Sequence, residues 1–177
     1  MKKFVRFTLI FVMLLLAASW LSSVAYGQTN DGIEQSGIFI EAAPSEAAPS
    51  ATFYGRAIGG VTAGDLFYID AVDSQADMSL DLYITNPDEL IHYFRYLILK
   101  ITVYIEDAEG QWQRVTSQNG TAMPDTYITL QNSPVSFVMP GMARYKVTVE
   151  SGCYHSLPFH ANSGMISPSF YLNVQPL

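Results

Sequence analysis

The chain has 177 residues, of which 49% are hydrophobic and only 14% are charged, and its formal net charge is −7 at pH 7. An acidic chain is repelled by nucleic-acid phosphates and by anionic lipids, so this composition excludes a nucleic-acid-binding protein. Its one cysteine, Cys153, cannot form an internal disulfide, so a hydrophobic core must hold the fold together, and a chain of this length can supply one.

The first 27 residues have the layout of a secretory signal peptide. Three basic residues precede an apolar stretch that ends at Leu21, and small residues follow, with cleavage positions after Ala25 and Gly27. An uncleaved anchor is the alternative, because the 19 residues from 7 to 25 approach the length of a membrane span. We expect cleavage, which gives a secreted or cell-surface protein without a membrane segment. The remaining chain then carries six basic and sixteen acidic residues, a charge of −10.

Residues 28–51 combine a short apolar segment with two tandem copies of EAAPS. In the segment SGIFIEA, Ile38 and Ile40 share one side of an expected strand. The repeat over 41–51 has little to bury, so we expect a solvated spacer before a domain that spans 52–177. Two interpretations of the apolar segment stay open. It folds back on its own domain, or it pairs with an exposed sheet edge of a neighbouring molecule.

From residue 52 onward, apolar side chains recur at every second position, which is the period of a β-strand. The alternation is cleanest where Met78, Leu80, Leu82 and Ile84 are separated by polar residues. Turn sequences rich in Gly, Pro, Asn and Asp separate the strand segments, and no helix is expected after the leader beyond one turn at 87–90. The pattern predicts an all-β protein, an antiparallel β-sandwich of about seven to nine strands. The segments are 65–72, 77–86, 93–107, 111–117, 125–130, 134–139, 143–150 and 168–174.

The longest apolar run outside the leader is YFRYLILKITVYIED, at 93–107. A membrane span would not place Lys100 at its centre and end on two acidic residues, and the many β-branched residues disfavour a helix. As a strand, its odd positions from Leu97 to Ile105 are aliphatic and should lie in the core, while its even face is mixed. A hairpin turn at 107–110 should lead to a returning strand that carries Trp112.

Residues 141–149, GMARYKVTV, resemble the penultimate strand of an immunoglobulin-like β-sandwich of the bacterial secreted type. The shared pattern is a turn glycine, then Ala-x-Tyr, then alternating valines. The resemblance implies an immunoglobulin-like sandwich in which the Tyr145 hydroxyl caps a corner by bonding to the backbone. The sequence departs from that family in lacking a cysteine pair, and Trp112 follows the long strand instead of lying within it. The resemblance implies an architecture and not an activity.

Cys153, His155 and His160 are the densest group of metal-binding residue types. Cys-x-His places both side chains on one face of a strand, and His160 lies beyond a proline-containing loop. The spacing matches no common zinc pattern, so we expect no metal site here. For Cys153 we expect burial as a small hydrophobic residue, with an intermolecular disulfide or a reactive thiol as alternatives.

Enzymatic chemistry has weak support in the sequence, and we expect a non-enzymatic protein without a cofactor. A cysteine nucleophile at Cys153, activated by His155, is the remaining enzyme interpretation. The arginine that secreted L,D-transpeptidases and sortases carry after their cysteine is absent, because no arginine follows Arg144. The acidic residues between Asp65 and Asp81 offer Ca²⁺ binding as an alternative to a solvated acidic face, although they lack EF-hand spacing.

Aromatic and aliphatic side chains on the strand faces expected to point outward are the candidate interaction surface. Exposed aromatic rings bind protein partners or the rings of sugars, unless another part of the chain covers them. We expect a protein partner or further copies of this chain, with a carbohydrate ligand as the alternative. The candidate residues are Tyr83, Tyr96, Ile98 and Tyr104, together with Ile38 and Ile40 of the N-terminal segment.

Overall fold

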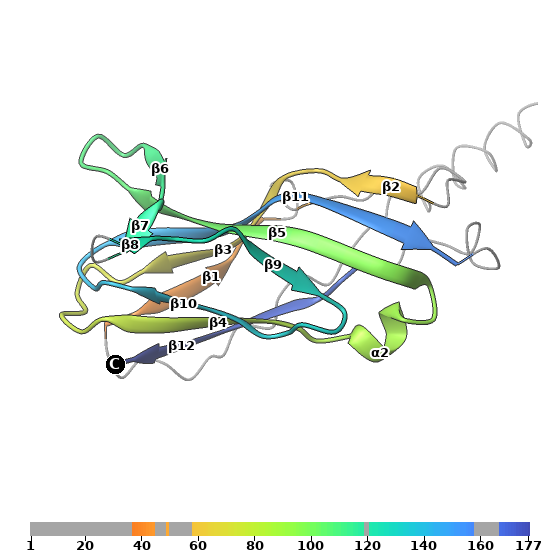
Figure 1. Cartoon of the computed structure of the whole chain (residues 1–177). Helices are drawn as coiled ribbons and strands as arrows, with labels where there is room; N and C mark the ends of the chain where they lie inside the picture. Colours follow the sequence, from red (N-terminus) through yellow and green to blue (C-terminus); the bar gives the residue numbers. More distant parts are fainter. Residues whose placement is uncertain (1–36, 45–48, 50–57, 119–120, 158–166) are drawn as a thin grey trace, which may run out of the picture.

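The structure, a computed structural model, describes residues 37–44, 49, 58–118, 121–157 and 167–177. Two antiparallel sheets pack face to face in it, so the prediction of an all-β antiparallel sandwich is confirmed (Figure 1). The expected leader and most of the EAAPS repeat lie outside the described residues. Within the described ranges, no helix is both long enough and apolar enough to cross a membrane.

The large sheet has seven strands, and the long apolar run is one of its interior strands, with paired strands on both sides. They are β1 (Phe39–Ala42), β2 (Ile58–Val61), β3 (Gly64–Asp70), β5 (Phe94–Glu106), β6 (Trp112–Arg114), β9 (Thr126–Thr129) and β11 (Arg144–Ser156). Their order is β1-β3-β11-β5-β6, with β2 also pairing with β11 and β9 with β5. Because β1 has a partner on one side only, it forms an edge of this sheet.

The small sheet has three strands in the order β10-β4-β12. They are β4 (Met78–Ile84), β10 (Val135–Met139) and β12 (Phe170–Pro176). A separate ribbon joins β7 (Ser117–Gln118) to β8 (Thr121–Ala122), and the one turn expected at 87–90 is the helix α2 (Pro87–Leu90). The described residues thus contain twelve strands instead of seven to nine, because the chain from 112 to 129 is divided into four short strands and because β1 and β2 precede the expected segments.

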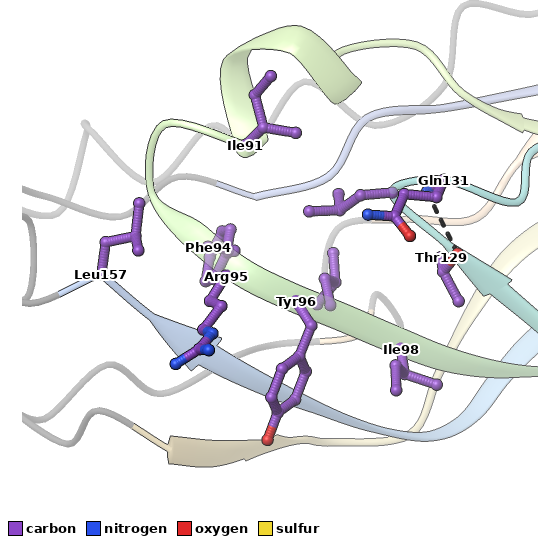
Figure 2. A pocket seen from close by; sticks show the side chains of 10 residues that line it. Ile91, Phe94, Arg95, Tyr96, Ile98, Thr129, Gln131 and Leu157 are labelled. Carbon is purple, nitrogen blue, oxygen red and sulfur yellow. Dashed lines mark hydrogen bonds between the residues drawn. The ribbon is translucent and has the colours of Figure 1, made fainter.

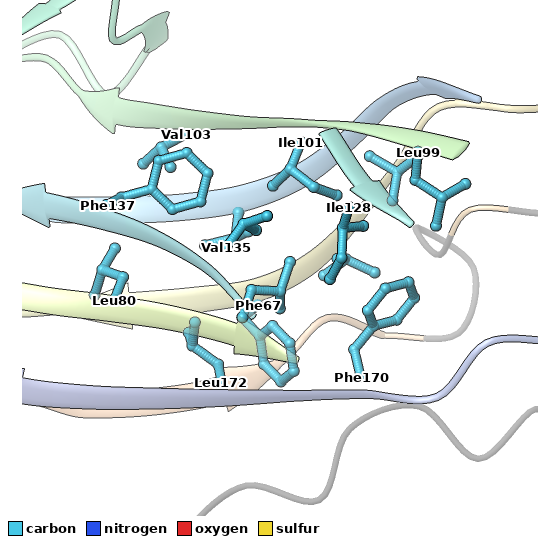
Figure 3. Close-up of a cluster of buried hydrophobic side chains, with 14 of the residues drawn as sticks. Phe67, Leu80, Leu99, Ile101, Val103, Ile128, Val135, Phe137, Phe170 and Leu172 are labelled. Atoms are coloured by element: carbon cyan, nitrogen blue, oxygen red, sulfur yellow. The ribbon is translucent and has the colours of Figure 1, made fainter. Parts of the chain in front are cut away.

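The core lies between the sheets and is built from the alternation seen in the sequence (Figure 3). On β5, the side chains of Leu97, Leu99, Ile101 and Val103 are at most 3% exposed, as predicted, while Ile105 is only partly buried. The four apolar residues predicted for one face of β4 are buried in the same way, and each such burial stabilises the fold by about 1.5 to 3 kcal/mol. The long run is therefore an interior strand.

The N-terminal apolar segment folds back on its own domain, which confirms the first of the two interpretations. β1 pairs with β3 from Phe39↔Asp70 to Ala42↔Phe67, and the N–H of Ala43 donates to the Leu66 carbonyl at 2.8 Å. Residues 37–44 therefore belong to the sandwich, and the solvated spacer expected from residue 41 does not include them. Ile38 was wrongly predicted as a surface residue, because it fills the core and is only 2% exposed.

A β-bulge at Glu150 reverses the alternation of β11. Val149 pairs with Ile101 and Ser151 with Lys100, so Glu150 has no partner position on β5. Tyr145, Val147 and Val149 face the core before the bulge, as predicted, and Tyr154 does so after it. Cys153 consequently faces outward and is exposed. The expected burial of Cys153 is wrong, because after the bulge the odd-numbered residues of β11 face outward and no longer face the core.

Tyr145 makes the contact that the resemblance implied. Its hydroxyl donates to the Pro140 carbonyl at 2.8 Å, and its side chain is 1% exposed. Burial, and then the nearby Asp77 carboxylate, raise the pKa of Tyr145 to about 12, so the hydroxyl keeps its proton and remains a donor. The predicted hairpin is also present, because Asp107 N–H donates to the Gln111 carbonyl at 2.9 Å and Gly110 takes a φ of +75°.

Candidate functional site

The outer face of the large sheet carries polar and aromatic side chains in rows that cross its strands. Antiparallel pairing sets each outward residue beside an outward residue of the next strand. The first row contains Phe39, Asp70, Arg144, Glu106 and Trp112. The second row contains Glu41, Tyr68, Lys146, Tyr104 and Arg114. The functional question is which parts of this face the protein's own side chains leave open.

Ion pairs cover the middle of this outer face. The Lys100 ammonium lies 2.9 Å from Asp125 and 3.2 Å from Glu150, and Arg114 reaches both carboxylates. The Thr102 hydroxyl donates to Glu150 at 2.8 Å. The hydrogen bond from Lys100 lowers the pKa of Asp125, and the bond from Thr102 lowers that of Glu150. The charges and hydrogen-bonding groups of these side chains are paired with one another, so the middle of the outer face is occupied by a solvated ion network.

Two of the acidic residues considered for Ca²⁺, Asp65 and Asp70, are bound by other groups of the protein. Asp65 accepts hydrogen bonds from the Tyr68 and Thr148 hydroxyls, both at 2.8 Å, and pairs with Lys146 at 3.2 Å. Burial and the bond to Asp65 raise the pKa of Tyr68 to about 12. Asp70 pairs with Arg144 at 2.9 Å. Among the residues that the structure describes, no three of the metal-binding types gather closely enough to hold an ion.

The predicted surface residues do not form one surface. Tyr83 lies on the small sheet, where its ring packs 6.0 Å from Tyr171. Tyr104 lies beneath the Lys146 ammonium, 5.3 Å from the ring centre. Tyr96 and Ile98 are at the opposite end of β5, Ile38 is in the core, and Ile40 is half-buried on β1. Only Tyr96 and Ile98 are brought together.

Cys153 and His155 share the outer face of β11, as the Cys-x-His pattern predicted. Cys153 stands opposite Ile98, and His155 stands opposite Tyr96. The His155 ring packs edge-on against Tyr96 with 5.6 Å between the ring centres. His160, the third member of the group, lies outside the described residues. The pair is therefore part of a mixed apolar patch around the start of β5.

A groove of about 400 Å³ opens beside this end of β5 (Figure 2). We call it the strand-edge groove. It is formed where β9 ends at Thr129 while β5 continues to Phe94, and the end of β11 closes it with Leu157. Ile91 is 49% exposed, and among the described residues that line the groove Arg95, also exposed, is the one that carries a charge. Its side-chain walls are Ile91, Arg95, Tyr96, Ile98, Leu130 and Leu157.

A second hollow, of about 440 Å³, lies at the other end of β5. We call it the aromatic hollow. The rings of Tyr68 and Trp112 stand 6.0 Å apart at 49° to each other, and Phe39 on β1 is 62% exposed. Sequence reasoning missed this site, because its residues come from strands far apart in the chain and only the sheet register brings them together. Its lining side chains include Phe39, Tyr68, Trp112, Asp70, Glu106 and Arg144.

Comparisons with known proteins do not place this chain in a family. No family model and no curated protein matches it. A structure of infectious bursal disease virus, Gx strain, is 17% identical with a TM-score of 0.33, and the match covers 77% of this chain and 29% of the viral one. The K1 cleaved adhesin domain of Lys-gingipain from Porphyromonas gingivalis W83 is 13% identical with a TM-score of 0.20, covering 72% of this chain and 85% of that domain.

The Gt strain of the same virus gives a TM-score of 0.24 at 13% identity, over 77% of this chain. This chain spans only 29 to 30% of the length of the two viral chains. Likenesses of this level carry no inference about activity or partners. The strand-edge groove and the aromatic hollow are the observations on which a proposal can rest.

Proposed function

We propose that this protein is a secreted, non-enzymatic β-sandwich of the cell envelope or extracellular matrix, and that it binds an extended segment of a partner protein in the strand-edge groove. The open stretch of β5 beside this groove carries the proposal. β9 pairs with β5 only as far as Ile98↔Thr129, and none of the described strands continues the pairing on this side to Leu97 and Tyr96. A strand edge next to an apolar groove is suited to the addition of one more strand.

The backbone of β5 has the orientation that strand addition needs. The Val115 N–H donates to the Val103 carbonyl at 3.0 Å, so Val103 directs its backbone groups toward β6 and β9. Every second residue of a strand points its N–H and carbonyl to the same side. β5 pairs with β9 without a register shift from Ile98 to Ile101, so this alternation is not interrupted there. Leu97 accordingly directs its backbone groups to the β9 side, and its N–H is the group that an added strand can bond.

The side chains of the groove indicate the character of the segment. Ile91, Ile98 and Leu157 offer apolar contacts to every second residue of an extended chain. Arg95 provides a positive charge, and none of the described residues that line the groove is acidic. A segment that alternates apolar residues and carries one carboxylate near Arg95 fits both features. The net charge of −7 opposes association between copies, which favours a different protein as the partner.

Two further features support a non-enzymatic role outside the cell. The basic start and apolar stretch of the leader are typical of an exported protein. The remaining enzyme interpretation needs His155 to activate Cys153, yet the His155 ring packs against Tyr96. We therefore assign the function to surface recognition.

A displayed library of random extended peptides tests the proposal. We expect enriched peptides to alternate apolar residues and to contain an acidic residue, and their binding to slow hydrogen exchange at the Leu97 amide. Ile91→Asp and Arg95→Glu should each weaken binding at least about tenfold, since each replaces a favourable contact with a repulsive one. Phe39→Asp, at the far edge of the sheet, is the matched control and should bind normally.

Two outcomes would contradict the proposal. One is peptide binding that neither groove substitution changes. The other is a dimer, seen by size-exclusion chromatography with light scattering, that Ile91→Asp converts to a monomer, because the occupant would then be a second copy of this chain.

A further inference from the structure

We infer that the aromatic hollow is a second binding site and that its ligand is a neutral saccharide. This inference is independent of the partner segment proposed above, because the strand-edge groove lies at the Phe94 end of β5 and the hollow at the Glu106 end. A hollow of about 440 Å³ with rings and a few converging polar groups has the size and composition of a small-ligand site.

Three aromatic rings provide apolar surface for the C–H face of a sugar ring. Phe39 is 62% exposed on the edge strand, so its ring is available to stack. Trp112 and Tyr68 form an angled pair with 6.0 Å between ring centres. The Lys146 ammonium lies 5.3 Å from the Trp112 ring centre and is itself held by Asp65 at 3.2 Å. The indole therefore has a neighbour in Tyr68 and another in Lys146 before any ligand is bound.

Hydrogen-bonding groups stand beside these rings in the order acceptor, donor, acceptor. Arg144 Nε lies 2.9 Å from Asp70 Oδ2, and its Nη1 lies 3.3 Å from Glu106 Oε2. The three side chains remain 53%, 43% and 26% exposed, so each has further capacity to bond outside the ion pairs. Neighbouring hydroxyls of a sugar both donate and accept, which suits an alternation of carboxylate and guanidinium.

The charge of the hollow selects among ligands. Glu41, Asp70 and Glu106 outnumber Arg144, and the whole chain is also acidic. A sugar that carries a carboxylate is therefore repelled. A bound cation is disfavoured as well, because the Arg144 guanidinium already lies between Asp70 and Glu106. A neutral saccharide meets the rings and the hydrogen-bonding groups without either penalty.

Tryptophan fluorescence gives a direct test, because the chain has two tryptophans and Trp20 lies in the leader. In a full-length Trp20→Phe variant, Trp112 is the single indole and reports on the hollow. We would titrate this variant with neutral hexasaccharides of glucose, mannose and N-acetylglucosamine, and with a hexamer of galacturonate. We expect at least one neutral series to change the emission saturably, and the galacturonate hexamer to have no effect at the same concentration.

Substitutions then locate the binding. Phe39→Ala and Arg144→Met should each weaken binding at least about tenfold. Tyr127→Ala removes a comparably exposed aromatic ring from β9, 45% exposed, and should bind as the parent does. Ile91→Asp should also retain saccharide binding, so failure of the groove proposal and failure of this one are distinguishable. Circular dichroism of each variant confirms that it is folded.

Three results would overturn the inference. They are a Trp112 emission that none of the neutral hexasaccharides changes, binding of the galacturonate hexamer as tight as that of the neutral ones, and unaltered affinity in a folded Phe39→Ala variant.

Discussion

Tyr145 fixes the corner between β10 and β11 through one hydroxyl. Its bond to the Pro140 carbonyl spans five residues of chain, and the ring is buried beneath it. Because the Pro140 carbonyl would lose a partner in Tyr145→Phe, that substitution should cost about 1 kcal/mol of stability. The residue was identifiable from GMARYKVTV alone. Its neighbour in space, Asp77, was not, because that contact depends on the fold.

Alkaline pH should destabilise the protein through its two protected tyrosines. The pKa values of Tyr68 and Tyr145 are raised from about 10 to about 12, so the folded state keeps protons that the unfolded state releases. The stabilisation is complete below pH 10, and the free energy of unfolding should fall as the pH rises from 10 to 12. Urea denaturation at fixed pH values measures this. A double Tyr68→Phe, Tyr145→Phe variant should show a shallower fall, and an unchanged fall would contradict the assignment.

At the scale of elements, β1 was the least predictable strand. SGIFIEA has a strand pattern, but its alternation is short and a proline-rich repeat follows, so the sequence left its partner open. The structure resolves this through Ile38, whose side chain enters the core, and through four residue pairs with β3. In contrast, β4 and β5 were predictable in detail, because long runs of alternating apolar residues specify which face is buried.

Two neighbouring residues test whether β1 belongs to the sandwich. Ile38→Ala should lower the free energy of unfolding by about 2 to 5 kcal/mol, because it removes a core side chain and leaves a cavity. Phe39→Ala, next to it on the exposed face, should change stability by less than about 0.5 kcal/mol. Chemical denaturation of both variants gives the comparison. Equal, small effects would mean that the segment does not contribute to the core in solution.

For the whole molecule, the sheet register determines which side chains form the two proposed sites more than any single sequence motif does. Phe39, Tyr68 and Trp112 lie on three strands, and they meet because each strand pairs at one particular offset. Those offsets arise from pairing between strands that lie far apart in the chain, which no local pattern in the sequence announced. The sandwich and most of its core were therefore predictable from periodicity, while both proposed binding sites required the assembled sheet.

The ion network across the outer face should make stability fall in acid. Asp125 and Glu150 have pKa values below their usual 3.8 and 4.5, because Lys100 and Thr102 bond to the carboxylates. Their stabilisation is present above these usual values and is lost as the pH falls toward the lowered ones. Glu150→Gln should reduce the acid dependence of thermal unfolding below about pH 4.5, and added salt should weaken it in the parent. Glu109→Gln, in the exposed hairpin turn, is the control and should behave like the parent.

The bulge at Glu150 also decides which changes of chain length β11 can accept. Its two halves bury residues of opposite parity, odd numbers up to Val149 and even numbers from Tyr154 onward. Deleting Glu150 alone would restore a regular strand and leave Cys153 outward and Tyr154 in the core, whereas deleting two residues here would turn Cys153 inward and expel the large Tyr154 ring into solvent. Homologous chains should therefore vary freely in the identity of the outward residues here, and lose at most one residue between Val149 and Tyr154.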